Sequence, residues 1–139
     1  MIKFTIPGEP QGKARARTGK GFSYTPEKTV NYEALIKQIY TYEAEGNKVY
    51  YPKEKAVELS IKAYYSIPKS ATKGKLLDMK YNIVRPCKKP DADNVLKIVC
   101  DALNKIAYDD DTQIVKATVE KYYAEIPRVE VEIRESEVV

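Results

Sequence analysis

The sequence of 139 residues has no histidine, only two cysteines and no long apolar run. Without histidine, Ser–His–Asp triads, imidazole-containing zinc sites and imidazole acid–base catalysis are all excluded. The cysteines, Cys87 and Cys100, lack metal-binding spacing, and we do not expect a disulfide framework. No apolar run approaches the ~20 residues of a membrane span, and the N-terminal residues do not resemble a secretion signal. We therefore expect a protein without membrane contact, located in the cytoplasm.

The length of the chain limits its architecture. A mass of 15.8 kDa is enough for one hydrophobic core and too small for two ordinary domains. Hydrophobic residues make up 43% of the chain and charged residues 32%, which is ordinary for a globular domain. We therefore expect residues 1–139 to form a single domain.

The hydrophobic periodicity predicts an α+β fold. Two amphipathic helices are indicated, together with a short basic helix whose signal is weaker. Their limits follow from apolar spacing and from capping residues. The expected elements are a strand at 2–6, a loop at 7–24, a helix capped by Thr25 with Pro26 at its first position and Gly46 past its end, a strand at 57–65, a basic helix at 69–80, a helix from Asp91 or Asp93 to about Lys105, a strand beginning at Val115, and a strand at 129–133 joined to it by a hairpin at Pro127–Arg128.

Charge is distributed unevenly along a chain whose net charge is only +4. Six of the seven aspartates lie between positions 91 and 111, whereas residues 62–89 contain eight basic residues against the single acid Asp78. A second basic stretch lies at residues 13–20. One such run alone is as easily a solvated face as a binding surface. Two basic stretches and one aspartate cluster together favour a polyanion held beside a divalent cation.

The helix predicted after Pro90 carries a polar stripe opposite its apolar face. Val95, Leu96, Val99, Leu103 and Ile106 are expected on the buried side, and Asp93, Lys97, Asp101 and Asn104 on the other. The simple explanation is an exposed face with ion pairs four residues apart. Two features argue against this explanation: two aspartates lie at the helix start, and three adjacent aspartates lie at 109–111. Adjacent carboxylates repel one another unless a cation is bound between them. Carboxylates are ligands that Mg²⁺ and Mn²⁺ prefer, and Lys97 would neutralise charge developing on a phosphate.

These residues resemble those of the RusA family of Holliday junction resolvases. The resemblance rests on the run from Lys89 to Lys97, on Asp101-Ala102-Leu103, and on Asp110-Asp111-Thr112-Gln113, in matching order and spacing. It implies a RusA-like, small mixed sheet of about four strands with two or three helices packed on it. It also implies a homodimeric endonuclease that uses Mg²⁺, with Mn²⁺ as a substitute, and nicks paired strands of branched DNA at four-way junctions.

The resemblance also implies roles for individual residues. By position, Asp91, Asp93 and Asp111 would be the catalytic metal ligands, and Lys97 a catalytic residue beside them. The basic residues expected to contact DNA are Lys13, Arg15, Arg17, Lys88 and Lys89. Ala92 and Lys105 stand where the family more often has a larger aliphatic residue and a glycine. With three adjacent acids at 109–111, the choice between Asp110 and Asp111 as third ligand stays open.

Other frameworks fit the sequence less well. A ribonuclease-H-like site needs an acid in the first strand, and residues 2–6 contain none. A restriction-enzyme-like site needs an acid two residues before a lysine on a strand, and only Asp78-Met79-Lys80 offers that, in a segment expected to be helix or loop. A second possibility, which the sequence leaves open, is a non-catalytic DNA-binding protein whose acidic cluster holds a structural divalent cation.

Overall fold

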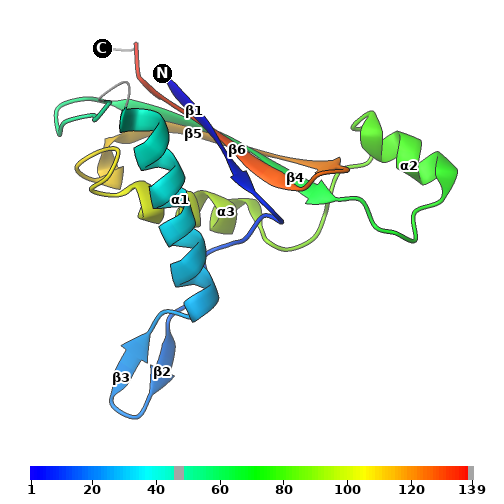
Figure 1. Ribbon diagram of the computed structural model, residues 1–139, viewed down its shortest axis with the longest axis horizontal. Coiled ribbons are helices and arrows are strands. Elements are labelled where there is room, and N and C mark those ends of the chain that lie inside the picture. The colour runs from blue at the N-terminus through cyan, green and yellow to red at the C-terminus, as the bar shows by residue number, and fades with distance from the viewer. Residues whose placement is uncertain (46–48, 138–139) are drawn as a thin grey trace.

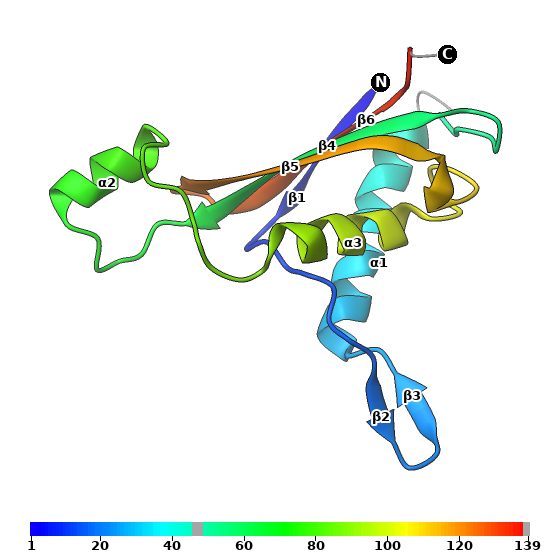
Figure 2. The same cartoon turned by 180° about the vertical axis from the view of Figure 1, so that it is seen from behind.

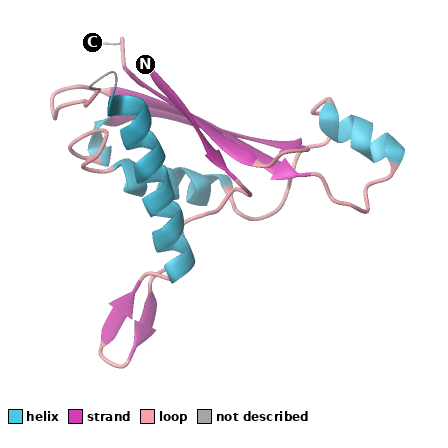
Figure 3. Ribbon diagram, in the orientation of Figure 1, coloured by secondary structure: helices cyan, strands magenta, loops and turns pink. Residues whose placement is uncertain are grey.

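The computed structural model describes residues 1–45 and 49–137, apart from the side chain of Arg17. Figures 1 and 3 show a sheet with helices packed against one of its faces, a further helix beyond one end of the sheet and a projecting hairpin. None of the described helices is both long and apolar enough to cross a lipid bilayer. The elements in chain order are β1 (Ile2–Pro7), β2 (Arg17–Gly19), β3 (Phe22–Tyr24), α1 (Glu27–Glu45), β4 (Val57–Ser66), α2 (Lys73–Lys80), α3 (Ala92–Leu103), the 3-10 helix η1 (Asp111–Gln113), β5 (Ile114–Ala124) and β6 (Arg128–Glu135).

The main sheet has four strands in the order β1–β6–β4–β5. β4 and β5 are parallel, whereas β6 is antiparallel to both of its neighbours, β1 and β4. The sheet is therefore mixed, and with three helices it confirms the predicted α+β class. α1 and α3 lie on one face of the sheet, and α2 lies beyond one end (Figures 1 and 2).

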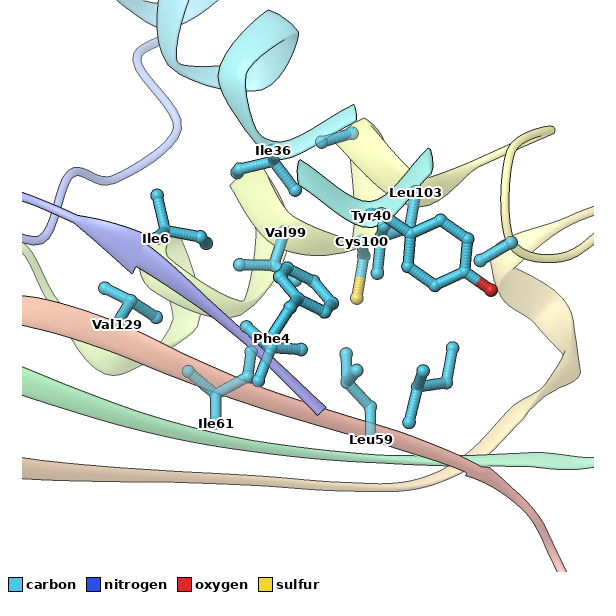
Figure 4. Packing of buried hydrophobic residues seen from close by; sticks show 14 of the residues in the cluster. Phe4, Ile6, Ile36, Tyr40, Leu59, Ile61, Val99, Cys100, Leu103 and Val129 are labelled. Carbon is cyan, nitrogen blue, oxygen red and sulfur yellow. The ribbon is translucent and has the colours of Figure 1, made fainter. Parts of the chain in front are cut away.

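The hydrophobic core lies between the sheet and the two helices. Every second residue of β4 from Val57 to Tyr65 is buried, as a strand covered on one face requires. α1 contributes Ile36 and Tyr40 to this layer, and Tyr40 packs edge-on against Phe4 of β1 (Figure 4). The residues on the other face of the sheet are partly exposed and mostly polar. One face of the sheet therefore builds the core, and the other remains uncovered by any described element.

α3 forms where the amphipathic pattern predicted a helix. Val95, Val99 and Leu103 are at most 1% exposed, and Leu96 packs against the core. The helix ends at Leu103, two residues before the expected end, because the backbone becomes extended at Asn104. The prediction that Ile106 continues the buried face was wrong, since it lies in the following turn and is 36% exposed.

The predicted loop at residues 7–24 contains the hairpin β2–β3. Its strands pair antiparallel, with Gly19 opposite Phe22, and Gly21 in the turn has a φ of +75°, which glycine adopts without strain. The strands have three residues each, and all residues of β3 are exposed. The alternation of buried and exposed residues by which longer strands are recognised is therefore missing here.

The predicted hairpin at Pro127–Arg128 was wrong. β5 and β6 follow each other closely in the chain, but β4 lies between them in the sheet. β4 has a buried residue at every second position and takes the central place, whereas Val115 of β5 is 61% exposed at the sheet edge.

The predicted start of α1 was one residue early, since the carbonyl of Pro26 accepts the N–H of Val30 and the helix begins at Glu27. Gly46, the predicted end signal, lies outside the described residues.

Gln113 fixes the segment before β5 to the segment before β4. Its side chain is buried, and Nε2 lies 3.1, 2.8 and 3.0 Å from the carbonyl oxygens of Tyr51, Pro52 and Lys55. Its Oε1 accepts the backbone N–H of Asp110 at 3.0 Å, which completes a capping box at η1. One amide thus joins two segments more than fifty residues apart in the sequence.

We predict that Gln113→Leu lowers the free energy of unfolding by about 2–4 kcal/mol, because several buried carbonyls lose their donor. The matched control is Gln38→Leu on the exposed side of α1, which should change stability by less than about 0.5 kcal/mol. Urea denaturation of both variants measures the difference. Equal midpoints for the two variants would show that the Gln113 amide contributes nothing to the fold.

Candidate active site and DNA interface

The segment that leads into α3 is held against the sheet by three hydrogen bonds. The Tyr65 hydroxyl donates to the carbonyl of Pro90 at 2.6 Å. Nζ of Lys121 donates to the carbonyl of Lys88 at 2.7 Å, and Nε of Arg85 donates to the carbonyl of Lys121 at 2.8 Å. The ends of β4 and β5 therefore fix the position at which α3 begins. Sequence analysis missed this role of the tyrosine and the lysine, because the contacts join segments far apart in the chain.

A loop after β1 supports the same helix start from another side. The backbone N–H of Lys13 donates to the carbonyl of Asn94 at 3.0 Å. A Cβ on Gly12 would lie 2.8 Å from the Cβ of Pro90 and 2.9 Å from that of Asn94, so this close approach requires glycine. Beside it a hollow of about 450 Å³ is lined by residues of this loop, of the α1 start and by Asp91.

Asp91 and Asp93 are both exposed at the start of α3. Asp91 is the N-cap residue, with φ −68° and ψ 155°, but its carboxylate makes no capping hydrogen bond. Neither carboxylate has a hydrogen-bond or ion-pair partner among the described residues. The positive end of the helix dipole favours negative charge at this place. Both side chains are therefore available to a ligand.

The aspartates at 109–111 have three different surroundings. Asp109 accepts a hydrogen bond from the Tyr50 hydroxyl. Asp110 caps η1, where Thr112 donates its backbone N–H and its hydroxyl to the carboxylate. The hydroxyl bond is the main cause of the lowered pKa of Asp110. Asp111 is exposed and has no hydrogen-bond or ion-pair partner in the described part of the chain. Asp109 and Asp110 thus have hydrogen-bond partners within the chain, and the expectation that a cation is bound at the triplet stays a prediction.

The structure does not gather Asp91, Asp93 and Asp111 into one group. Asp91 and Asp93 lie at the start of α3, whereas Asp111 begins η1 and acts electrostatically on Cys100, near the other end of the helix. Within residues 1–45 and 49–137, no three acidic or cysteine side chains lie close enough together to hold a metal ion. Carboxylate oxygens suit Mg²⁺ and Mn²⁺, but the arrangement in a single chain does not fit an ion bound by all three aspartates.

Lys97 lies one turn after Asp93 on the same exposed stripe. Its ammonium is 3.9 Å from Asp101, and its side chain is 63% exposed, so it is free to meet a ligand. Asp101 is also 3.3 Å from the Lys13 ammonium, which lies 2.5 Å from Glu33 of α1. Of the two ion pairs that a simple exposed face would have, Lys97 with Asp101 is present, and Asp93 with Lys97 is not among those of the described residues.

The basic residues predicted to bind DNA differ in their surroundings. Lys13 is occupied by two carboxylates, which favours a structural role. Arg15, Lys88 and Lys89 are exposed. The backbone of Arg17 lies in β2, and its side chain is outside the described residues. Arg15 lies two residues before the hairpin β2–β3, which projects from the rest of the fold in Figure 1.

The hairpin also carries two aromatic side chains that sequence analysis missed. Phe22 is 59% exposed and Tyr24 is 47% exposed, and their ring centroids are 6.0 Å apart. Aromatic residues at alternate positions after a glycine turn could have indicated this strand. Exposed rings beside basic residues are typical of surfaces that stack on nucleic-acid bases.

The buried Cys100 does not supply a second reactive centre. Burial, together with the negative charges of Asp111 and Asp101, raises the pKa of Cys100 to about 11. Cys100 is therefore a neutral core residue at physiological pH. Cys87 is exposed in the segment before α3, and no other cysteine is present.

The basic hairpin with its exposed aromatic rings, close in the chain to the loop that lines the hollow beside Asp91, is typical of proteins that act on nucleic acid. Residues 7–134 match the family of Endodeoxyribonuclease RusA. The chain belongs to this family. It is also similar to "Uncharacterized protein YqaN" of Bacillus subtilis (strain 168), with 39% identity over 140 residues that cover 96% of each chain.

The ion pairs of Lys13 allow its role to be separated from that of Arg15. We predict that Lys13→Ala costs about 1–2 kcal/mol of unfolding free energy, because Glu33 and Asp101 lose their partner. Arg15→Ala should leave stability unchanged and reduce the salt dependence of DNA binding by roughly one phosphate contact. Urea denaturation and binding at several salt concentrations measure the two effects. A stable Lys13→Ala protein with a reduced salt slope would assign that lysine to the DNA instead.

Proposed function

We propose that this protein is a structure-specific endodeoxyribonuclease that resolves Holliday junctions by paired nicks. The observation that carries the proposal is the pair Asp91 and Asp93, exposed and unpartnered on a rigidly held helix start, in a chain of the RusA family. Chemistry on a phosphodiester requires groups held in a fixed geometry. The bonds from Tyr65 and Lys121 to the preceding segment supply that rigidity.

The charge distribution supports DNA binding on the side of α3 and the hairpin. On the uncovered sheet face two arginines are held in ion pairs, Arg134 with Glu58 and Arg128 with Glu130. By contrast, Lys88 and Lys89 are exposed next to Asp91, and no ion pair of theirs is found in the described residues. A duplex arm that runs from Lys88 and Lys89 toward the hairpin β2–β3 would pass the carboxylates of Asp91 and Asp93. Phosphate contacts of this kind supply affinity and orient the substrate.

The proposed catalytic residues are Asp91, Asp93, Asp111 and Lys97. The Lys97 ammonium is exposed on the stripe that begins at Asp93 and would stabilise negative charge developing on the phosphate oxygens. Asp111 is preferred over Asp110, whose carboxylate is committed to the η1 cap. Mg²⁺, with Mn²⁺ as substitute, is the proposed cofactor, and a homodimer is the proposed assembly, because paired nicks require two sites.

A non-catalytic DNA-binding protein is the second candidate. The observation that favours it is that one chain does not gather three carboxylates into a metal-binding group among its described residues. A synthetic four-way junction with Mg²⁺ separates the two functions. The nuclease should nick opposite strands of the junction and leave a linear duplex of the same sequence intact. Tight binding without cleavage would establish the second candidate.

We predict that Asp91→Asn, Asp93→Asn and Asp111→Asn each reduce junction cleavage by on the order of 10²–10³-fold, the usual effect of removing one group that stabilises a charged transition state. Junction binding should remain, because basic residues supply most of the affinity. Asp110→Asn is the matched control and should retain cleavage, since that carboxylate faces Thr112. Single-turnover cleavage and gel-shift binding measure both properties. An Asp93→Asn protein as active as the wild type would refute the assignment.

We further propose that the hairpin rings stack on unpaired bases at the branch point. Phe22→Ala and Tyr24→Ala should each weaken junction binding by about 1–3 kcal/mol, the usual value for stacking on one base. The control is Tyr42→Ala on α1, a tyrosine that is 77% exposed and lies outside the hairpin. The fluorescence of 2-aminopurine at the branch point reports the stacking directly. A signal that is the same with and without the two rings would exclude this contact.

A further inference from the structure

The segment between β4 and α3 exposes apolar side chains that the core does not use. We call residues 67–84 the α2 lobe, since α2 forms its centre beyond the end of the sheet (Figure 1). Met79 is buried and anchors the lobe. Four large apolar residues are exposed at its end, and two of them, Tyr81 and Ile83, are 74% and 73% exposed; the others are Leu77 and Val84. Apolar residues that are grouped on a surface, and not scattered singly, mark a contact site.

Hydrogen bonds hold the backbone of this lobe although its apolar side chains are uncovered. The carbonyl of Asp78 accepts the N–H groups of Ile83 and Val84 at 2.8 and 3.1 Å. Asn82 has a φ of +62°, a left-handed conformation that asparagine adopts more readily than most residues. Tyr81 and Ile83, on either side of it, are therefore presented on a hydrogen-bonded turn.

The α2 lobe is also basic. It contains four lysines and one acid, Asp78. The Lys80 ammonium is 2.8 Å from Glu125, between β5 and β6, and this ion pair joins the lobe to the end of the sheet. The other three lysines are exposed, and no ion pair of theirs is found within residues 1–45 and 49–137: Lys69, Lys73 and Lys75. A polyanion is therefore the partner whose charge complements this surface.

The lobe is continuous with the basic segment at the proposed active site. After the lobe the chain runs back to the start of α3 (Figure 2), and Lys88 and Lys89 are exposed just before Asp91. Arg85 fixes this return, because its Nε donates to the carbonyl of Lys121 at 2.8 Å. Basic residues thus continue from the carboxylates into the lobe, which favours DNA over an unrelated partner.

We propose that the α2 lobe is a wedge that recognises the branch point of the DNA. Its lysines bind the phosphates of one arm, and Tyr81 and Ile83 insert between the base pairs where that arm leaves the junction. A base step at a branch lacks a continuous stack, so it costs less to open than a step inside a duplex, and inserted apolar side chains are a common way to open it. The wedge rests on the proposed function, because it takes branched DNA to be the substrate.

The exposure of the two side chains favours insertion over other modes of contact. Side chains that line a groove for a peptide are partly covered by its walls, whereas Tyr81 and Ile83 are largely exposed and project from a turn. Figures 1 and 2 show the lobe and the hairpin β2–β3 reaching outward in different directions, with the start of α3 between them. Two contact elements on either side of the carboxylates fit a substrate that branches beside the scissile bond.

Replacing the exposed apolar pair tests the wedge. Tyr81→Ala combined with Ile83→Ala should lower the preference for a four-way junction over a linear duplex of the same sequence by at least about tenfold, because only the branch offers a step that opens at little cost. Gel-shift binding without divalent metal measures this preference while no strand is cut. Permanganate oxidation of thymines beside the branch should increase with the wild type and not with the double variant. The control, Tyr42→Ala combined with Val30→Ala, changes two exposed residues of α1 and should keep the preference.

Replacing lysines tests whether DNA is the partner of the lobe. Lys73→Ala combined with Lys75→Ala should weaken the binding of junction and duplex alike and reduce its salt dependence by roughly two phosphate contacts. The matched control is Lys37→Ala combined with Lys53→Ala, two exposed lysines outside the lobe, which should leave the salt dependence unchanged. An unaltered salt dependence in the Lys73 and Lys75 variant would overturn the proposal and leave the lobe to a protein or an anionic membrane.

The outcomes separate the wedge from the nuclease function. The wedge is overturned if the Tyr81 and Ile83 variant keeps the preference for junctions, or if the wild type has none, and junction cleavage by the wild type then still supports the nuclease. A wild type that prefers junctions through these two residues but cuts none supports the wedge and rejects the nuclease function.

Discussion

The burial of one face of α3 against the sheet and α1 is the constraint on which the rest of the arrangement depends. Val95, Ile98 and Val99 are almost fully inaccessible to solvent, and burying each such side chain contributes about 1.5–3 kcal/mol. A helix fixed in this way cannot rotate about its axis without exposing them. The stripe from Asp93 to Lys97 is therefore forced outward, into solvent, where a phosphodiester can reach it.

The start of α3 is held as firmly as its buried face. Tyr65 and Lys121 hold the preceding segment to the ends of two parallel strands, and the close approach of Gly12 supports it from the other side. These contacts use backbone carbonyls, so they fix the chain and leave the carboxylates free. The two sides of one helix thus have different tasks: the apolar side and the backbone maintain the geometry, and the exposed side chains remain available for the proposed binding of DNA and a cation.

The parts of this arrangement that local sequence determines could be predicted. The alternation in β4 and the apolar stripe of α3 gave the elements and most of the buried residues, and the spacing of Asp91, Asp93 and Lys97 gave the candidate site. Contacts between distant segments could not be predicted. The order of the strands depends on which strand is best covered, so the expected hairpin at Pro127 was wrong. The separate surroundings of Asp109, Asp110 and Asp111 depend on Tyr50 and Thr112, which no spacing rule indicates.

The central claim is that the unpartnered aspartates form a site for a divalent cation, and thermal unfolding tests it most directly. A cation that binds only the folded protein adds about 2.7 kcal/mol of stability at a hundredfold excess over its dissociation constant. Millimolar Mg²⁺ or Mn²⁺ should therefore raise the melting temperature of the wild type, with a smaller rise for Asp93→Asn. Without metal the same substitution should leave stability unchanged or increase it, because it removes a repelling charge. A melting temperature that does not respond to divalent ions up to tens of millimolar would contradict the account.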